Sequence, residues 1–510
     1  MENAPQNSKA SLLKKIFFWL APLLSLSIVL FGDLDPERPE TTYTLAVAVL
    51  MAIWWMTDVV PLAITSLLPL LLFPLFGVMD GKVVSATYFN HIIFLFLGGF
   101  LVALAIEKWG LHKRIALRIL SMVGSSPARI MLGFMLATAF LSMWISNTAT
   151  TMMMVPILIS IISKLEEVNG REKISNYAIG MLLAVAYSSS IGGISTLVGT
   201  APNLSFVRIL ETHFPNAPEI NFTNWFLFAL PITIILFILL YVYLYFLYVR
   251  KKTEWKNIDK SEIKQSYRDL GKVTFEEKVL IVAFVSMALL WFFRADIQIG
   301  QFRIPGWSNL FPEPGYFNDG TVAIFIAIIL FLIPSKQKKP DHIMDWKTST
   351  KIPWEIILLF GGGFALAAGI KESGLSNWFG EQLLFLKGVH PLILILCITF
   401  LITFLTEITS NTATVETFLP ILAGLAMSIE SNPILFMIPA TIAGSMAFML
   451  PVATPPNAIV FGTKRLRMAQ MARTGLVLNL IAITVIALMT YFYGTEIFNA
   501  DPTVYPDWAK

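Results

Sequence analysis

The chain contains the polar pentad Ser146-Asn147-Thr148-Ala149-Thr150 twice. The same five residues return 264 positions later (410 against 146) as Ser410-Asn411-Thr412-Ala413-Thr414. The offset also holds nearby, since Gly98-Gly99-Phe100 matches Gly362-Gly363-Phe364. A polar pentad repeated in register within an apolar chain indicates a duplicated fold with one polar centre in each half.

Both pentads are embedded in apolar sequence. The first follows Met131 to Trp144 and precedes Met152 to Ile162. At membrane depth, lipid cannot satisfy the hydrogen bonds of serine, asparagine and threonine or of an irregular backbone. We therefore expect each pentad to line a cavity enclosed by protein. The alternative is a packing interface in which small polar residues join neighbouring helices.

The composition is that of a membrane protein. Of 510 residues, 56% are hydrophobic and 14% are charged, and the mean hydropathy is +0.70. Soluble domains carry roughly 25% charged residues. The net charge of +4 comes from basic residues clustered in loops, so it indicates no nucleic-acid surface. The single cysteine excludes an internal disulfide.

A spanning helix needs about 20 mostly apolar residues, which predicts an all-α polytopic protein with about eleven transmembrane helices. Two further segments, 129–165 and 391–429, are predicted as re-entrant hairpins with Ser-Asn-Thr at their tips. Amphipathic segments 110–124 and 374–387 precede them and are expected to lie along the membrane interface. The predicted spans are 16–32, 42–60, 61–78, 91–107, 177–212 (broken), 223–249, 277–294, 319–334, 353–371, 434–462 (broken) and 474–494.

Basic loops indicate the orientation. They predict an integral plasma-membrane protein with a cytoplasmic N-terminus, marked by Lys14 and Lys15, and an extracytoplasmic C-terminus. The two hairpins then enter from opposite sides, so the repeats are inverted, as in secondary transporters. The predicted organisation is N-terminal spans 1–60, first repeat 61–250, cytoplasmic loop 251–276, second repeat 277–495 and extracytoplasmic tail 496–510.

The hairpin tips and broken spans predict ion-binding chemistry. Helix N-termini present free N–H groups that suit anions, and helix C-termini present carbonyls that suit Na⁺. Gly199-Thr200-Ala201-Pro202-Asn203 and Ala453-Thr454-Pro455-Pro456-Asn457 interrupt the broken spans, because proline and glycine disrupt helices. We expect each to face one pentad, giving a central substrate site flanked by two cation sites.

No Lys or Arg lies at a predicted tip. An anionic substrate would then depend on N–H groups, hydroxyls and bound cations, which favours co-transport with Na⁺. Importing a dianion against about 100 mV costs roughly 4.6 kcal/mol, at about 2.3 per charge. Two Na⁺ cancel this cost, so more than two are expected for coupling.

Two acidic residues near the second tip, Glu407 and Glu416, have no counterparts in the first repeat, where Met143 and Met152 stand. They could form a coupling-ion or proton site in one half. The interpretation we prefer is a carboxylate near a hairpin end that is paired or faces water. The five histidines show no metal-ligand spacing.

These motifs resemble the divalent anion/sodium symporter family of di- and tricarboxylate transporters. The resemblance runs from Trp54-Trp55-Met56-Thr57 to the last span, and its most specific parts are the two Ser-Asn-Thr motifs, 406–412 and 449–458. It implies a homodimer surrounded by membrane lipid. It also implies that a scaffold domain, including 1–60, holds a transport domain that moves by an elevator mechanism.

The resemblance also implies site residues. A first Na⁺ would lie near Ser142, Ser146, Asn147 and Gly199, and a second near Thr406, Thr409, Asn411 and Ala453. The residues implied to bind the substrate carboxylates are Ser146, Asn147, Thr148, Ser410, Asn411, Thr412, Thr454 and Pro455.

The predicted function is sodium-coupled import of C4-dicarboxylates such as succinate, fumarate and malate. A citrate symporter and a sodium-independent dicarboxylate exchanger of the same fold are the nearest alternatives, and sulfate is a further one. An enzyme with Ser146 or Ser410 as nucleophile is disfavoured, because no His or Lys stands near either as a base. Inverted hairpins favour alternating access over a channel.

Overall fold

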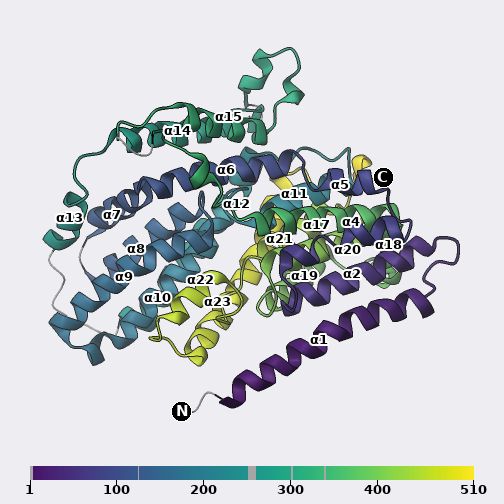
Figure 1. The fold of residues 1–510 in the computed structure, drawn as a ribbon, viewed down its shortest axis with the longest axis horizontal. Helices are drawn as coiled ribbons and strands as arrows, with labels where there is room; N and C mark the ends of the chain where they lie inside the picture. Colours follow the sequence, from purple (N-terminus) through teal and green to yellow (C-terminus); the bar gives the residue numbers. More distant parts are fainter. Residues whose placement is uncertain (1–3, 125, 251–259, 300–301, 338–340) are drawn as a thin grey trace.

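The computed structural model describes residues 4–510 except 125, 251–259, 300–301 and 338–340 (Figure 1). The start of the predicted loop 251–276 lies outside the described residues. Helices make up most of the described chain. A two-stranded antiparallel hairpin, β1 (Ile297–Ile299) and β2 (Phe302–Ile304), projects at the top of Figure 1. Short 3₁₀ turns cover Trp307–Leu310, Pro314–Tyr316, Leu384–Leu386 and Asp507–Ala509.

The N-terminal part contains α1 (Ala4–Phe31), which packs along α2 (Pro39–Thr57). The predicted single span 61–78 is instead two short helices, α3 (Leu62–Thr65) and α4 (Leu68–Leu75). Pro69 explains this difference, because proline has no N–H to continue a helix and is favoured in a first turn. Two helices complete this part: α5 (Gly81–Thr87) and α6 (His91–Lys108).

The remaining helices lie in the rest of the predicted first repeat and in the predicted second repeat. The first contains α7 (Leu111–Val123), α8 (Pro127–Ser142), α9 (Asn147–Asn169), α10 (Arg171–Gly193), α11 (Ala201–His213) and α12 (Phe222–Leu244), which continues as a π-helical turn, Tyr245–Val249. After α13 (Lys260–Arg268), the second contains α14 (Phe275–Phe292), α15 (Asp319–Leu332), α16 (Trp346–Ser349), α17 (Trp354–Glu372), α18 (Leu375–Gln382), α19 (Pro391–Leu405), α20 (Asn411–Ser428), α21 (Ile434–Ala443), α22 (Pro455–Gly462), α23 (Met468–Met489), a π-helical turn (Thr490–Gly494) and α24 (Thr495–Ile497).

Each pentad stands between two helices, as the hairpin prediction requires. Helix α8 ends at Ser142 and α9 begins at Asn147, while α19 ends at Leu405 and α20 begins at Asn411. The amphipathic segments form α7 and α18, and each begins after a glycine in the left-handed conformation, Gly110 (φ 70°) or Gly374 (φ 77°). Glycine adopts this conformation without the steric penalty of a side chain.

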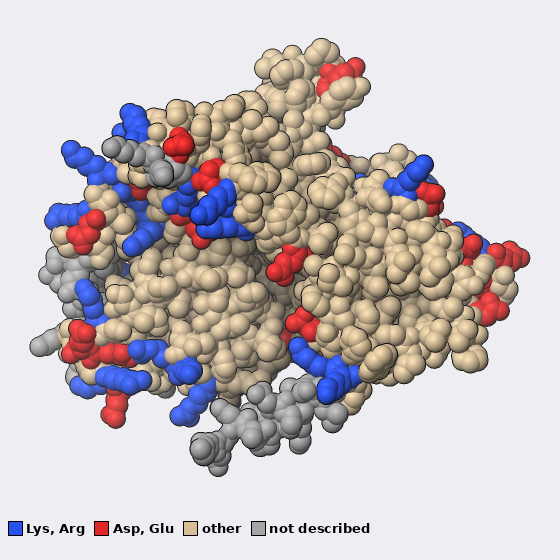
Figure 2. All heavy atoms as spheres, in the orientation of Figure 1, with Lys and Arg blue, Asp and Glu red and all other residues tan. Residues whose placement is uncertain are grey.

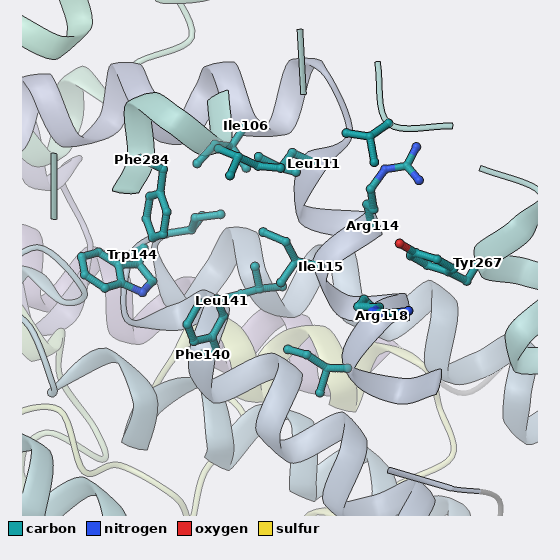
Figure 3. Close-up of a pocket in the computed structure, with 14 residues that line it drawn as sticks. Ile106, Leu111, Arg114, Ile115, Arg118, Phe140, Leu141, Trp144, Tyr267 and Phe284 are labelled. Carbon is teal, nitrogen blue, oxygen red and sulfur yellow. The ribbon is translucent and has the colours of Figure 1, made fainter. Parts of the chain in front are cut away.

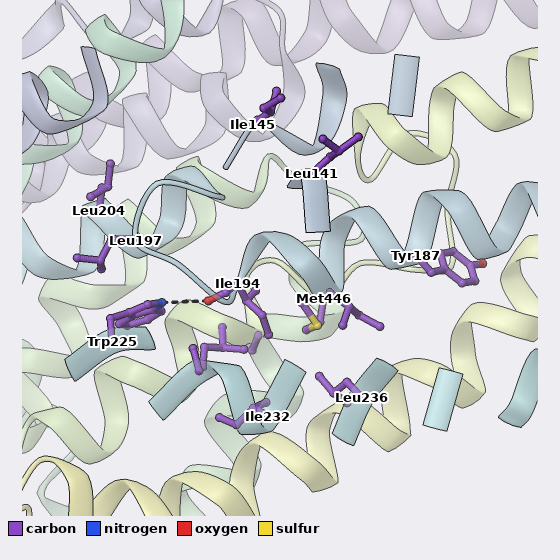
Figure 4. Packing of buried hydrophobic residues seen from close by; sticks show 14 of the residues in the cluster. Leu141, Ile145, Tyr187, Ile194, Leu197, Leu204, Trp225, Ile232, Leu236 and Met446 are labelled. Carbon is purple, nitrogen blue, oxygen red and sulfur yellow. Dashed lines mark hydrogen bonds between the residues drawn. The ribbon is translucent and has the colours of Figure 1, made fainter. Parts of the chain in front are cut away.

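The predicted broken spans are also helix pairs separated by irregular backbone. Residues 194–200 separate α10 from α11, and residues 444–454 separate α21 from α22. Figure 4 shows the packing around these breaks, where the Trp225 indole donates to the Ile194 carbonyl at 2.9 Å. From α10, the Tyr187 hydroxyl donates to the Phe448 carbonyl in the second break at 2.7 Å. Side chains thus satisfy carbonyls that have no partner in a helix.

Helix α17 packs closely against its neighbours through Gly361-Gly362-Gly363. A Cβ at Gly361 would clash with Tyr88, at Gly362 with Ser66, and at Gly363 with Glu416. The glycine triplet therefore allows close helix packing.

The surface is that of a membrane protein. Seven helical stretches in the described part of the chain are long and apolar enough to cross a membrane. Lys and Arg gather at one end of the view in Figure 2, over α7, α13 and the ends of α8 to α10, and again near the start of α1. Large apolar side chains elsewhere are exposed, including Leu71, Val282 and Phe325. Such exposure is expected where lipid replaces water.

Candidate functional site

A cavity of about 910 Å³ lies where the two repeats meet, and both pentads and both helix breaks line it. All residues predicted to bind substrate lie on its wall: Ser146, Asn147, Thr148, Ser410, Asn411, Thr412, Thr454 and Pro455. Three predicted cation ligands, Gly199, Thr409 and Ala453, line it as well. The other two, Ser142 and Thr406, are fully buried beside it.

Four helices begin at this cavity. Helices α9 and α20 begin in the pentads, while α11 begins after Thr200 and α22 after Thr454. Ser146 caps α9 by accepting from the Ala149 N–H at 3.3 Å, whereas Ser410 makes no such bond to α20. Helix N-termini concentrate free N–H groups and positive partial charge, so this arrangement favours an anion.

The charged side chains on the cavity wall are acidic, so their sign is opposite to the positive partial charge of the helix N-termini. Its charged residues are the exposed Asp58 and Glu355, and no Lys or Arg is among the described lining residues. The protein therefore offers an anion only dipoles, N–H groups and hydroxyls here. A bound cation would supply the missing positive charge.

One oxygen cluster lies beside the first pentad. The Ser142 hydroxyl donates to Asn147 Oδ1 at 2.6 Å. A Cβ at Gly193 would clash with the same Oδ1, and a Cβ at Gly199 would clash with the Gly193 carbonyl. Hydroxyl, amide and backbone oxygens thus converge around two glycines, which matches the ligand preference of a hard cation.

The second pentad has an equivalent oxygen cluster. Thr406 Oγ1 lies 2.8 Å from Asn411 Oδ1 and 2.9 Å from the Gly444 carbonyl oxygen. One hydroxyl proton cannot fully satisfy both acceptors, so a cation would suit this group. The Thr409 hydroxyl is engaged elsewhere, since it donates to the Leu405 carbonyl at 2.8 Å and contacts Thr414 Oγ1.

Glu407 holds the second helix break in place. Its Oε1 accepts from the N–H groups of Phe448 at 2.7 Å and Met449 at 2.8 Å. Asn479 Nδ2 also donates to Oε1 at 2.7 Å, and the Leu450 N–H donates to Oε2 at 3.0 Å. This buried carboxylate fits the preferred interpretation of a paired group. It positions the backbone next to the second oxygen cluster.

Glu416 does not fit the interpretation of a carboxylate that is paired or faces water. Its side chain is fully buried and neither reaches water nor forms an ion pair within the described chain. The Ser205 hydroxyl donates to Oε1 at 2.9 Å, and Oε2 has no hydrogen-bond partner. The carboxyl packs against Gly363 of α17. Sequence position gave no indication of this, because Ser205 and Gly363 lie on α11 and α17, far from Glu416 in the chain.

The asparagines of the two Pro-Asn pairs connect each helix to the break before it. Asn203 Nδ2 donates to the Thr196 carbonyl at 2.8 Å, and Asn457 Nδ2 donates to the Ala447 and Leu450 carbonyls at 3.1 and 3.0 Å. In the first repeat, Thr196 Oγ1 also donates to the Met143 carbonyl at 2.5 Å. These bonds fix the irregular backbone without occupying the cavity.

Sequence reasoning missed several residues of this site. Thr200 lines the cavity as the repeat counterpart of Thr454, and comparing the two interrupted motifs would have identified it. Gly193 and Gly444 contribute carbonyls at the ends of α10 and α21. Their sequence signal is a glycine at the start of each helix break.

Comparison with known proteins identifies the family. A family model described as the sodium:sulfate symporter transmembrane region matches residues 16–499. The chain belongs to this family. The match confirms the resemblance to sodium-coupled divalent-anion symporters, and it makes the molecule an integral membrane protein of a transporter family.

Two relatives are named sodium-dependent dicarboxylate transporter SdcS. The protein from Staphylococcus saprophyticus is 42% identical over 510 residues, covering 98% of this chain and 95% of the relative. The protein from Staphylococcus aureus strain bovine RF122 is 43% identical over 487 residues, covering 94% and 91%. Both are named as transporters, in agreement with the prediction that the chain is not an enzyme.

Two solved membrane transporters share the fold at low identity. MtrF of Neisseria gonorrhoeae has a TM-score of 0.51 and 15% identity, with 80% of this chain and 84% of that chain covered. The YdaH transporter of Alcanivorax borkumensis has a TM-score of 0.53 and 12% identity, with 82% and 88% covered. These likenesses support a helical membrane-transporter architecture.

Proposed function

We propose that this protein is a sodium-coupled symporter that imports C4-dicarboxylates such as succinate, fumarate and malate. One observation carries the proposal: four helix N-termini and both Ser-Asn-Thr motifs line a cavity whose charged wall residues are acidic. Such a site suits an anion only together with cations. The relatives named sodium-dependent dicarboxylate transporters support this choice of substrate and ion.

In this proposal the two pentads bind the two carboxylates of one substrate. Ser146, Asn147 and Thr148 contact one carboxylate, and Ser410, Asn411 and Thr412 contact the other. The N-termini of α9 and α20 add N–H groups and favourable dipoles. Thr454 and Pro455 complete the wall, with the Thr454 hydroxyl accepting from the Asn457 N–H at 3.3 Å.

Two Na⁺ ions bind next to the substrate in this proposal. The first is held by oxygens around Ser142, Ser146, Asn147 and Gly199. The second is held by oxygens around Thr406, Asn411 and Ala453, with Thr409 beside it. The resulting positive charge offsets the substrate's two negative charges. Electrogenic uptake needs more than two Na⁺, because each charge crossing about 100 mV involves roughly 2.3 kcal/mol.

Transport follows an elevator mechanism in this proposal, within a homodimer. A scaffold that includes residues 1–60 stays fixed, and the inverted hairpins move with the substrate. The N-terminus is cytoplasmic and the C-terminus extracytoplasmic. Asp58 and Glu355 then lie at the cytoplasmic mouth, because the Asp58 carbonyl accepts from Lys14 at 3.3 Å and Glu355 closely follows Lys351. The cavity in this conformation accordingly opens inward.

Radiolabelled succinate uptake into proteoliposomes tests the function. Vesicles are assayed with Na⁺ or K⁺ outside, with and without an inside-negative potential, and with citrate or sulfate as competitors. Steep Na⁺ dependence and faster uptake at negative potential are expected. Uptake driven by internal dicarboxylate and indifferent to Na⁺ would instead identify an exchanger. Stronger competition by citrate or sulfate would change the substrate assignment.

A further inference from the structure

A second cavity, separate from the substrate site, lies between the first hairpin, α7 and α14. Its volume is about 480 Å³, within the roughly 300 to 1,000 Å³ typical of small-molecule sites. Its lining side chains come from α6, α7, α8, the first hairpin tip, α13, α14 and the residues before α14. Most are apolar, so a polar dicarboxylate does not fit this cavity.

The cavity has one cationic end and one aromatic end. Figure 3 shows Arg114, Arg118 and Tyr267 on one side, and Trp144 and Phe284 on the opposite side. Aliphatic side chains lie between the two ends. This polarity matches an amphiphile with an acidic head group and an acyl chain.

The two arginines differ in their partners, because Arg114 forms an ion pair with Glu277. Arg114 Nε donates to Glu277 Oε1 at 2.7 Å, and its guanidinium also donates to the carbonyls of Leu270 and Gly271 at 3.1 and 3.0 Å. Arg118 is exposed and stacks on Tyr267, with its Cζ 5.6 Å from the ring centroid. No carboxylate pairs with Arg118 in the described part of the chain.

The cavity reaches the molecular surface. Two of its lining side chains, Phe140 on α8 and Ile281 on α14, are 39% and 40% exposed. Arg118 lies on α7, one of the helices over which Lys and Arg gather in Figure 2, and the proposed orientation places that end at the cytoplasmic leaflet. Anionic lipids attract basic residues at that surface.

We propose that this cavity binds an anionic phospholipid, with an acyl chain among the apolar residues and the phosphate at Arg118. This inference rests on the orientation proposed above but not on the transported substrate. The lipid would contact α14 and also Trp144 and Ile145, which directly precede Ser146 at the hairpin tip. It would therefore stabilise the arrangement of hairpin and α14 seen here.

Lipid titration of the purified full-length protein in detergent tests this proposal. Phosphatidylglycerol and phosphatidylcholine with identical acyl chains are added separately. Bound lipid is counted by native mass spectrometry, and the unfolding temperature is recorded. We expect one phosphatidylglycerol to bind about fivefold to tenfold more tightly than phosphatidylcholine and to raise the unfolding temperature.

Matched variants identify the site. Arg118→Ala should remove this preference, while Lys113→Ala, an exposed cation on the same helix outside the cavity, should retain it. Ile115→Trp should reduce binding of both lipids by filling the cavity, with elution as a folded, monodisperse protein showing that it folds. Equal binding of both lipids, or equal effects of Arg118→Ala and Lys113→Ala, would overturn the proposal. Because binding is measured without transport, this failure would leave the proposed symport untouched.

Discussion

Replacing Glu407 with glutamine should weaken Na⁺ activation of uptake by about tenfold to a hundredfold. Four donors converge on this carboxylate: three successive N–H groups from residues 448–450 and the amide of Asn479. They hold the backbone that leads to Ala453 and adjoins the Thr406–Asn411 oxygen pair. The substitution keeps the size of the side chain but removes its charge and one acceptor.

The magnitude follows from the bonds that glutamine cannot make. Its carbonyl oxygen can replace Oε1, but its amide nitrogen would face the Leu450 N–H, which now donates to Oε2 at 3.0 Å. A hydrogen bond to a charged group contributes about 1.5 to 3 kcal/mol, and a buried donor left unpaired costs a similar amount. Losing about 1.5 to 3 kcal/mol of loop stabilisation corresponds to roughly tenfold to a hundredfold in affinity.

The assay is succinate uptake into proteoliposomes across a range of Na⁺ concentrations. The half-activating Na⁺ concentration should rise in Glu407→Gln, while the purified variant should still elute as a folded protein. Wild-type Na⁺ activation in a folded Glu407→Gln protein would refute the positioning role. A loss of folded protein would show that the carboxylate supports the fold as a whole.

Three further predictions concern the oxygen clusters. Asn147→Ala and Asn411→Ala should each abolish succinate uptake while leaving a folded, monodisperse protein, and normal uptake by either would contradict the site assignment. Gly193→Ala should raise the half-activating Na⁺ concentration at least about tenfold, since its Cβ would clash with a cluster oxygen. Gly462→Ala is its control, because a Cβ there meets nothing within 4 Å. Thr196→Val should weaken Na⁺ activation by roughly fivefold to tenfold, because it removes a hydrogen bond of about 1 kcal/mol and leaves the partly buried Met143 carbonyl without that donor. Unchanged activation would show that this bond does not support the first cluster.

The sequence alone determined where the chain interrupts its helices. Both pentads stand between two helices, and both Pro-Asn motifs begin a helix after irregular backbone. These predictions succeeded because each signal is local: polar residues, proline and glycine within an apolar run leave few structures that satisfy the backbone in a membrane. The predicted single span 61–78 is wrong, because Pro69 in the first turn of α4 divides it into α3 and α4.

The in-register repeat agrees with the site residues that the family resemblance implies. Ser142 and Thr406 occupy equivalent positions, and each hydroxyl contacts the asparagine five residues later. That separation places them across the tip of one hairpin, so the contact depends on a single local turn. The remaining lining residues come together because the two repeats pack face to face.

Only the tertiary structure decided how distant groups complete the site. Glu407 finds its donors 41 to 72 residues away, and Thr409 directs its hydroxyl to a helix carbonyl and Thr414 rather than to Asn411. Glu416 packs between Ser205 and Gly363, although neither lies near it in sequence. Such contacts depend on how separate helices pack against one another, and helix packing depends on side-chain shape rather than on any pattern along one segment.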